Sequence, residues 1–412
     1  MIKRLIVLIG FLMSVTSCAS GDSTAAGETL IESITQMAAN ASNVSGSATV
    51  DVEIDDAAEL NQETQETETT DPVTSVPPTR KPTIPPEINP LTGLLVENPV
   101  ILHRRPILVK VENLPRRSRP QWGLSLADIV YEYHTEEGST RFGALFYSQN
   151  AEKVGPVRSG RIFDIQLIQM YKSIFIFGGA FSTVMEEFGN YDFGDRFVIE
   201  GPYTDPALFR YEPDGRNYLL ANLYEMDAVI GFYGIDNTLP DLEGMTFDET
   251  QPVNGLDADK IFVRFSSAIY NRWDYEPESG RYFRYSDADN AYSSSDEVYE
   301  QLFDRLTGEP IAADNLVILM VKNVPFAPNI YDILLSGQGE AFIARDGQIF
   351  DVLWSRENPE DILSLVREDG TPFPFKPGQT WFEVLSDPTN VEKQGDSWRF
   401  TFRMPELWDD GS

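Results

Sequence analysis

The composition of the chain changes sharply near residue 88, and this change limits the part that can fold to the residues after that point. Residues 19–87 are rich in Ser, Thr, Ala, Glu and Asp, and they include a repetitive acidic stretch at 62–70 and a proline-rich stretch at 72–86. Such a segment buries too little apolar surface to offset the chain entropy lost on folding. We therefore predict a disordered, acidic, Ser/Thr/Pro-rich tether over residues 18–87 and a globular part that begins near Asn89.

The N-terminus has the order of parts found in a bacterial export signal. A basic start, Met1–Arg4, is followed by an apolar run, Leu5–Met13, and then by the short sequence Val15–Cys18. The apolar run is shorter than the roughly 20 residues that a membrane-spanning helix needs. The last four residues resemble the lipobox of bacterial lipoproteins, in which the cysteine becomes the first mature residue and carries a lipid. We predict a signal peptide over residues 1–17 and lipidation at Cys18; the alternative is an ordinary secretory signal that contains a cysteine.

Composition narrows the classes of function. Cys18 is the only cysteine, so the mature domain can form no internal disulfide and has no thiol nucleophile. The 412 residues are 42% hydrophobic, which is enough for one or two cores. The net charge of −33 argues against nucleic acid as a partner, because binding to phosphate backbones needs clustered Lys and Arg. The predicted location is extracytoplasmic, with the membrane as a partner through the lipid anchor.

Hydrophobic patterning predicts an α/β or α+β fold, with a mixed N-terminal domain followed by a mostly β C-terminal domain. In the first segment, residues 88–240, the patterns predict strands at 107–112, 129–135, 140–148 and 174–177, and helices at 162–171, 183–188 and 219–230. Residues 235–258 are rich in Pro, Asp, Gly and Asn, which indicates a boundary. In the second segment, residues 255–405, the patterns predict strands at 260–265 and 316–321, and hairpins that join 273–275 to 282–285 and 340–344 to 348–354.

The globular part carries a series of short motifs in a definite order. They are Asn89–Gly93, Asn113, Arg119–Leu124, Ala127–Glu132, Thr140–Phe142, Gly155–Arg161, Gly337–Glu340, Trp354 and Pro377–Trp381. Together they resemble the YerB-like lipoproteins, a family also called domain of unknown function 3048, over roughly residues 89–386. The resemblance implies a two-domain, membrane-tethered envelope protein with no agreed biochemical activity. The chain has Phe177 and Ala221 where the resemblance leads us to expect histidine, so imidazole chemistry at these positions is not expected.

The loop Gly155–Arg161 is the strongest candidate for a binding site. Arg158 and Arg161 flank Ser159 just before a predicted helix, and guanidinium groups, a hydroxyl and free helix N–H groups suit a carboxylate or a phosphate. The remaining ligand-binding candidates come from the other motifs: Arg119, Gln121, Asp128, Glu132, Glu136 and Arg141. The structural alternative is that the arginines pair with Asp128, Glu132 and Glu136 in a partly buried network.

The sequence gives less support for catalysis in this region than for binding. Glu132, His134 and Glu136 alternate along a predicted strand, so all three are expected on one face, which would suit a metal site or acid–base chemistry. Serine catalysis at Ser159 needs a neighbouring base, and His103 and His134 are the only histidines. The sequence has no P-loop, no dinucleotide glycine fingerprint and no Cys/His zinc spacing, so we predict neither a cofactor nor a metal.

Two hypotheses of function remain open at this point. The first is a tethered binding or scaffold module for an anionic ligand of the cell envelope, such as an envelope polymer, or for a partner protein of the envelope. The second is an envelope hydrolase or transferase that uses Asp or Glu residues, such as Asp128 or Glu132, for acid–base catalysis.

The lipid anchor yields a direct test. Changing Cys18→Ala removes the thiol that would carry the lipid, so we expect the protein to leave the membrane fraction. Fractionation of cells that express the variant, compared with the unchanged chain, measures this shift. An unaltered membrane fraction in the variant would contradict lipidation at Cys18.

Overall fold

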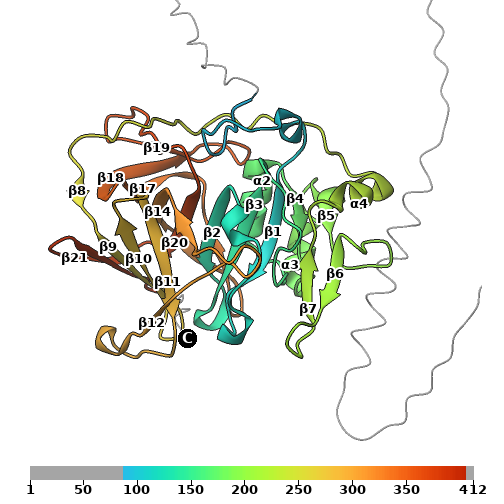
Figure 1. Cartoon of the computed structure of the whole chain (residues 1–412), viewed down its shortest axis with the longest axis horizontal. Coiled ribbons are helices and arrows are strands. Elements are labelled where there is room, and N and C mark those ends of the chain that lie inside the picture. Colours follow the sequence, from blue (N-terminus) through green and yellow to red (C-terminus); the bar gives the residue numbers. More distant parts are fainter. Residues whose placement is uncertain (1–86, 405–412) are drawn as a thin grey trace, which may run out of the picture. The chain divides into compact units, whose positions relative to one another are not determined.

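Two β-sheets form the frame of the described residues, which are residues 87–404 of a computed structural model (Figure 1). The predicted signal peptide and tether lie outside these residues. In spatial order, the large mixed sheet contains β19 (Ser364–Val366), β18 (Gln348–Arg356), β17 (Gly337–Arg345), β14 (Asn315–Val321), β20 (Thr380–Ser386), β2 (Ile129–His134), β3 (Thr140–Phe146), β1 (Ile107–Glu112), β4 (Ile174–Ile176) and β5 (Phe197–Val198), with β8 (Leu256–Asp257) beside β18.

The second sheet and two separate hairpins complete the strands. The second sheet contains, in spatial order, β12 (Tyr299–Gln301), β11 (Arg281–Asp287), β10 (Tyr270–Glu276), β9 (Lys260–Arg264), β22 (Ser397–Thr401) and β21 (Asn390–Gln394), with β13 (Ala312–Ala313) beside β11. The hairpins are β6 (Leu208–Tyr211) with β7 (Tyr218–Ala221), and β15 (Asn323–Ala327) with β16 (Ile330–Ile333).

The α-helices are short and fall in the first half of the described residues. The α-helices are α2 (Asp164–Tyr171), α3 (Ser182–Phe188) and α4 (Met226–Tyr233). The 3-10 helices are η1 (Pro99–Leu102), η2 (Arg116–Ser118), η3 (Leu124–Leu126), η4 (Glu136–Gly138), η5 (Gly194–Arg196) and η6 (Ser294–Asp296). This order confirms the predicted fold class, a mixed N-terminal part followed by a mostly β C-terminal part. None of the helices within residues 87–404 is both long and apolar enough to cross a membrane.

The helix predicted over residues 219–230 is wrong in its first half. Residues Tyr218–Ala221 form the buried strand β7, and α4 begins only at Met226. Between them Asn222 accepts a hydrogen bond from the backbone N–H of Tyr224, a local turn that separates the two elements. A short apolar run does not by itself distinguish a buried strand from a helix, and here pairing with β6 decides the outcome.

Strand β20 joins the two halves of the large sheet. It pairs in parallel with β2 on one side and with β14 on the other. Because β2 belongs to the first predicted segment and β14 and β20 to the second, strands from both segments share one sheet. The domain boundary predicted between residues 240 and 255 remains a prediction. Strands from before and after it are hydrogen-bonded within the same large sheet.

The central strands alternate as their sequences predict. Ile129, Tyr131 and Tyr133 of β2 face one side of the sheet, and Glu132 and His134 face the other. On the first side α2 lies against β3, where Gly143 leaves room for its helix: a Cβ at this position would lie 2.8 Å from Cδ1 of Leu167. One hydrophobic core therefore lies between the sheet and α2.

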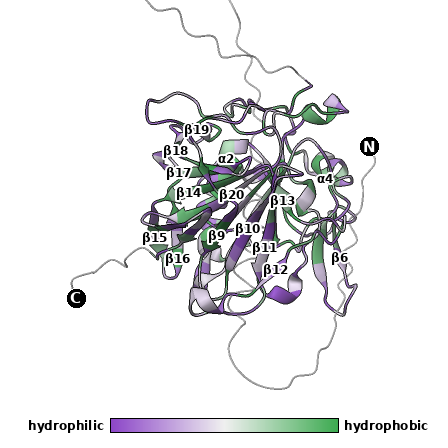
Figure 2. Ribbon diagram, turned by 60° about the vertical axis from the view of Figure 1, so that its left-hand side comes forward, coloured by the Kyte–Doolittle hydropathy of each residue, from purple (hydrophilic) through white to green (hydrophobic). Residues whose placement is uncertain are grey.

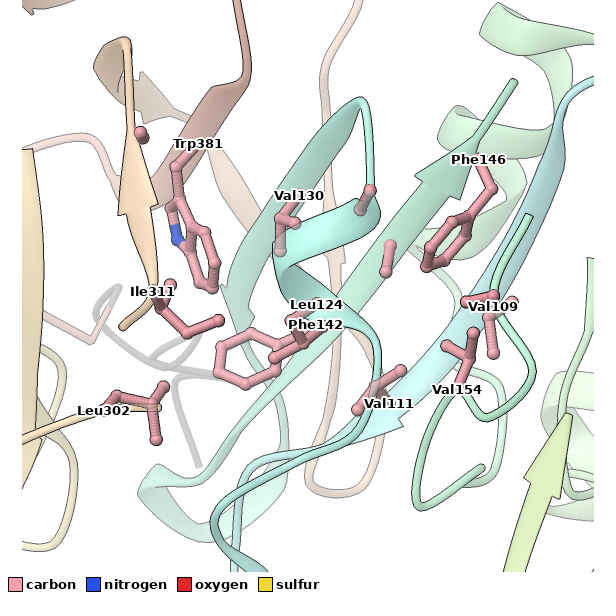
Figure 3. Close-up of a cluster of buried hydrophobic side chains, with 14 of the residues drawn as sticks. Val109, Val111, Leu124, Val130, Phe142, Phe146, Val154, Leu302, Ile311 and Trp381 are labelled. Atoms are coloured by element: carbon pink, nitrogen blue, oxygen red, sulfur yellow. The ribbon is translucent and has the colours of Figure 1, made fainter. Parts of the chain in front are cut away.

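The other side of the large sheet packs against the second sheet. Val130, Phe142 and Trp381 contribute to this core, and Figure 3 shows how they approach one another. Trp381 also meets Trp273 of the second sheet edge to face, with 5.2 Å between ring centroids. Figure 2 shows β14 in hydrophobic colours, and every residue of β14 and of β20 is buried, so these central strands are covered on both faces.

Between the sheets lies a buried charged group of three residues. Glu132 and Glu383 are neighbours in the parallel register of β2 and β20, and both are fully buried. Arg284 of β11 donates to both carboxylates, at 2.6 Å to Oε2 of Glu132 and 3.0 Å to Oε1 of Glu383. Burial, followed by the nearby charge of Glu132, raises the pKa of Glu383 to about 8. The group therefore has one arginine for two carboxylates and avoids two negative charges at neutral pH.

Removal of this arginine is expected to be costly. In Arg284→Met the carboxylate of Glu132 loses its buried partner, so we expect the free energy of unfolding to fall by about 3–5 kcal/mol. Arg272→Met is the matched control, because Arg272 of β10 pairs with Asp274 at a partly exposed position and its loss should cost about 1 kcal/mol or less. Denaturant unfolding measures both, and equal losses would show that the buried group contributes little.

The raised pKa of Glu383 predicts a dependence of stability on pH. Between its ordinary value of 4.5 and about 8, folded Glu383 holds a proton that the unfolded chain releases, so stability falls as pH rises through this window. Gln cannot titrate. The unchanged protein should therefore lose stability between pH 5 and pH 8 while Glu383→Gln does not lose this contribution. The difference in free energy of unfolding, variant minus unchanged protein, should rise across this range. A difference that stays constant across this range would rule out the shift.

Candidate functional site

The arginine cluster, defined here as Arg141, Arg158 and Arg161, is assembled from one strand and one loop. Arg141 lies on β3, in register with Glu112 of β1 and Tyr133 of β2, so these three side chains share one face of the sheet. The loop after β3 brings in the other two arginines, since the backbone N–H of Arg158 donates to the carbonyl of Lys110 at 2.9 Å. The loop thus runs beside the end of β1, where Val157 forms an isolated antiparallel bridge with Val111.

A buried ion pair holds this loop and α2 on the sheet. Nζ of Lys110 lies 3.1 Å from Oδ1 of Asp164, and neither side chain is exposed. Asp164 also accepts the hydroxyl of Tyr133 and, at 2.7 Å, the backbone N–H of Arg161. Burial lowers the pKa of Lys110 to about 7 and raises the pKa of Asp164. This arrangement fixes the first turn of α2 and, with it, the end of the arginine loop.

Two of the three arginines have carboxylate partners. Arg158 lies 2.5 Å from Oε1 of Glu112, and its side chain is 49% exposed. Arg161 lies 2.6 Å from Oε1 of Glu136, and its side chain is almost buried. The cluster is therefore half open to solvent at Arg158 and closed at Arg161.

Arg141 has no carboxylate partner within residues 87–404. Its Nη1 donates a hydrogen bond to the backbone carbonyl of Ser159 at 2.5 Å. Burial, together with the nearby charges of Arg161 and Arg158, lowers the pKa of Arg141 to about 10. Since Lys110, Arg158 and Arg161 each have their own carboxylate, the guanidinium of Arg141 is an extra positive charge at this place in the fold.

The surroundings of the cluster leave space on one side. A small cavity lies beside the Arg161–Glu136 pair and reaches Asn329–Tyr331 in the β15–β16 hairpin. On the other side the loop 158–160 hydrogen-bonds to Gly178 and Gly179, which carry no side chains. Of the three arginines, Arg161 lines this small cavity and Arg158 is half exposed, so solvent reaches the cluster from the side of Arg158.

Three of the other predicted site residues lie apart from the cluster. Arg119 pairs with Asp287 through both terminal nitrogens, at 3.1 Å each, next to the second sheet. Asp128 accepts the side chain of Asn89 and the backbone N–H groups of two residues after β3. Glu132 lies in the buried group between the sheets, on the opposite face from Arg141. Gln121, in contrast, donates to the backbone carbonyl of Glu112 and so supports the strand that holds Arg158.

The predicted alignment of Glu132, His134 and Glu136 is wrong at Glu136. Strand β2 ends at His134, and Glu136 lies in η4, from which it reaches Arg161. His134 is buried against Phe402, and burial lowers its pKa to about 4. Across the described part of the chain, no group of three or more His, Cys, Asp and Glu side chains is placed to hold a metal ion.

Sequence reasoning missed Lys110, Glu112 and Asp164, the residues that organise the cluster. The available signal was the pair Lys110 and Glu112, two charges spaced by two residues in the otherwise apolar strand 107–112. Such charges point to one face and need partners when the strand is buried. Asp164 carried no comparable signal, because an acidic residue at the first turn of a helix is common.

Larger hollows lie elsewhere, near the end of α2. Two of them, with volumes of about 470 and 390 Å³, share Lys172, Asp241 and Glu360. Their walls carry both signs of charge with acidic groups in excess, and none of the predicted site residues lies there. The arginine cluster is therefore the better candidate for a functional site.

Comparisons with known proteins agree with the motifs. Residues 91–217 match the family described as "Protein of unknown function (DUF3048) N-terminal domain", and residues 261–382 match its C-terminal domain. The chain is 31% identical over 306 residues to the protein named "Putative lipoprotein YerB" of Bacillus subtilis (strain 168), which covers 72% of this chain and 86% of that protein.

A solved structure is also similar. The crystal structure of the YerB protein from Bacillus subtilis matches with a TM-score of 0.61 and 26% identity, over 72% of this chain and 96% of that one. The resemblance predicted from the sequence motifs is confirmed. The chain belongs to the DUF3048 family of proteins of unknown function and contains both its N-terminal and its C-terminal domain.

Proposed function

We propose that this protein is a membrane-tethered, extracytoplasmic lipoprotein that binds an anionic ligand of the cell envelope through Arg141, Arg158 and Arg161. The location is supported by the export signal in the sequence and by the similarity to a protein named as a lipoprotein. The binding role is supported by the arginine cluster.

The observation that carries the proposal is the unpaired guanidinium of Arg141. Burial and the repulsion from Arg161 and Arg158 make the charged guanidinium of Arg141 unfavourable, and the nearby carboxylates of Glu136 and Asp164, which already pair with Arg161 and Lys110, offset this only in part. Proteins keep such destabilising arrangements chiefly where function needs them. A bound carboxylate or phosphate would remove the cost, since it would supply the missing negative charge through charge-assisted hydrogen bonds.

The enzymatic alternative, acid–base catalysis by Asp128 or Glu132, has little support. Asp128 accepts hydrogen bonds from four donors of Asn89, Tyr147 and Ser148. Glu132 likewise accepts from four side chains, one of them that of Arg284, in the interior between the sheets. Both carboxylates are buried and occupied, which suits a structural role.

Substitution of Arg141 separates binding from stability. In Arg141→Gln no carboxylate loses a partner, so we expect the free energy of unfolding to change by less than about 0.5 kcal/mol or to rise. Binding of a hexaglutamate peptide or of tripolyphosphate to the full-length protein, measured by calorimetry, should weaken at least about tenfold.

Two control variants complete this test. Arg161→Gln strands Glu136 and should lower stability by about 1–3 kcal/mol. Arg272→Gln removes a paired arginine from the second sheet and should leave anion binding unchanged. Strong destabilisation of Arg141→Gln, or undiminished binding of both anions, would contradict the proposed site.

A further inference from the structure

A shelf beside the arginine cluster combines a bare backbone with an exposed aromatic ring. We define the shelf as Arg158, Gly178, Gly179 and Phe181. The two glycines follow directly after β4 and the buried Phe177, and the backbone N–H of Gly178 donates to the carbonyl of Arg158 at 2.9 Å. The backbone N–H of Gly160 donates to the carbonyl of Gly179 at 2.8 Å. The two loops therefore lie side by side, and their relative position is fixed by hydrogen bonds.

The floor of the shelf is free of side chains. A Cβ at Gly179 would have no atom within 4 Å, and the backbone there has φ of +84°, a conformation that favours glycine. Gly178 is exposed. Gly178 and Gly179 therefore leave backbone without side chains of its own between the arginine loop and the start of α3.

Phe181 closes the shelf at its far end and is unlike the phenylalanines around it. Phe175, Phe177 and Phe188 are buried in an aromatic core, whereas Phe181 is 61% exposed. The guanidinium of Arg161 lies 5.5 Å from the centroid of its ring. This contact holds the ring beside the arginine cluster and leaves much of its surface in solvent.

We infer that the ligand of the arginine cluster is an acidic saccharide, a glycan whose sugar units carry carboxylate or phosphate groups. A pyranose ring presents C–H groups on one face, which pack against an aromatic ring, and hydroxyl groups at its rim, which can reach the backbone of the shelf. Its acidic substituent would lie on Arg158 and beside the unpaired Arg141. This inference rests on the proposed function and adds to it the chemical class of the ligand.

The decisive variant is Phe181→Ala, because Phe181 makes none of the ion pairs of the cluster. The probes are hexagalacturonate, an acidic saccharide, and hexaglutamate, an anion without sugar rings, each titrated into the full-length protein by calorimetry. We expect Phe181→Ala to weaken hexagalacturonate binding about tenfold and to leave hexaglutamate binding unchanged. Phe181→Tyr should restore the affinity for hexagalacturonate.

The matched control is Phe232→Ala. It removes a ring on α4 that is 60% exposed and that packs on Tyr203 instead of on an arginine.

Each other outcome has a defined meaning. Equal binding of hexagalacturonate by Phe181→Ala and the unchanged protein, or an equal loss for both probes, would overturn the saccharide inference. If Arg141→Gln still abolished hexaglutamate binding in that case, the proposed anion site would stand. Binding of the neutral cellohexaose as tight as that of hexagalacturonate would also overturn the inference, because the acidic groups would then be irrelevant. Failure of the unchanged protein to bind either anion would overturn both proposals.

Discussion

The buried guanidinium of Arg284 is the interaction on which the arrangement of the two sheets depends. It serves two carboxylates, Glu132 and Glu383, that are neighbours in the parallel pairing of β2 and β20. A shift of either strand by one residue would turn its carboxylate to the opposite face and leave the arginine without that partner. The group therefore specifies the register at the place where strands of the N-terminal and C-terminal family segments meet. Hydrophobic packing around it, with Trp273 and Trp381 in contact, supplies stability but specifies the register less sharply.

The buried charges on the two faces of the large sheet are balanced in different ways. On the face toward the second sheet, Glu132 and Glu383 share one arginine, and the raised pKa of Glu383 removes the excess negative charge. On the face toward α2, the Lys110–Asp164 pair fixes the loop, and one cation, Arg141, is left over. The first arrangement is complete in itself, and a structural role accounts for it. The second has one more cation than carboxylates, and this difference distinguishes a structural group from a candidate binding site.

Much of the architecture could be predicted from the sequence, because strong periodicity and turn residues reflect local physics. The strand 107–112 and the hairpins around Glu278–Gly280 and Arg345–Gly347 follow their patterns. The run Tyr218–Ala221 misled prediction because its apolar residues fit a helix equally well, and only its partner β6 decides for a strand. The motif containing Arg158 and Arg161 was visible in the sequence, but its contacts with Glu112 and Asp164 were not, since pairing between separate segments brings these residues together. Likewise, nothing local indicates that β20 enters the sheet beside β2.

That late entry of β20 has a consequence for how the protein is made. Ile129 of β2 pairs with Thr380 of β20, so one edge of β2 waits for a partner about 250 residues further along the chain. In a chain that is exported and folds outside the cytoplasm, as we propose, this interval is the time that the intervening residues need to cross the membrane. During it, β2 has an open strand edge, which invites mispairing with other chains, and until Arg284 has also crossed, Glu132 lacks its charged partner. Premature termination before residue 380 would leave this edge of β2 permanently unpaired. Correct strand pairing in the first half of the molecule therefore depends on nearly the last strand of the chain.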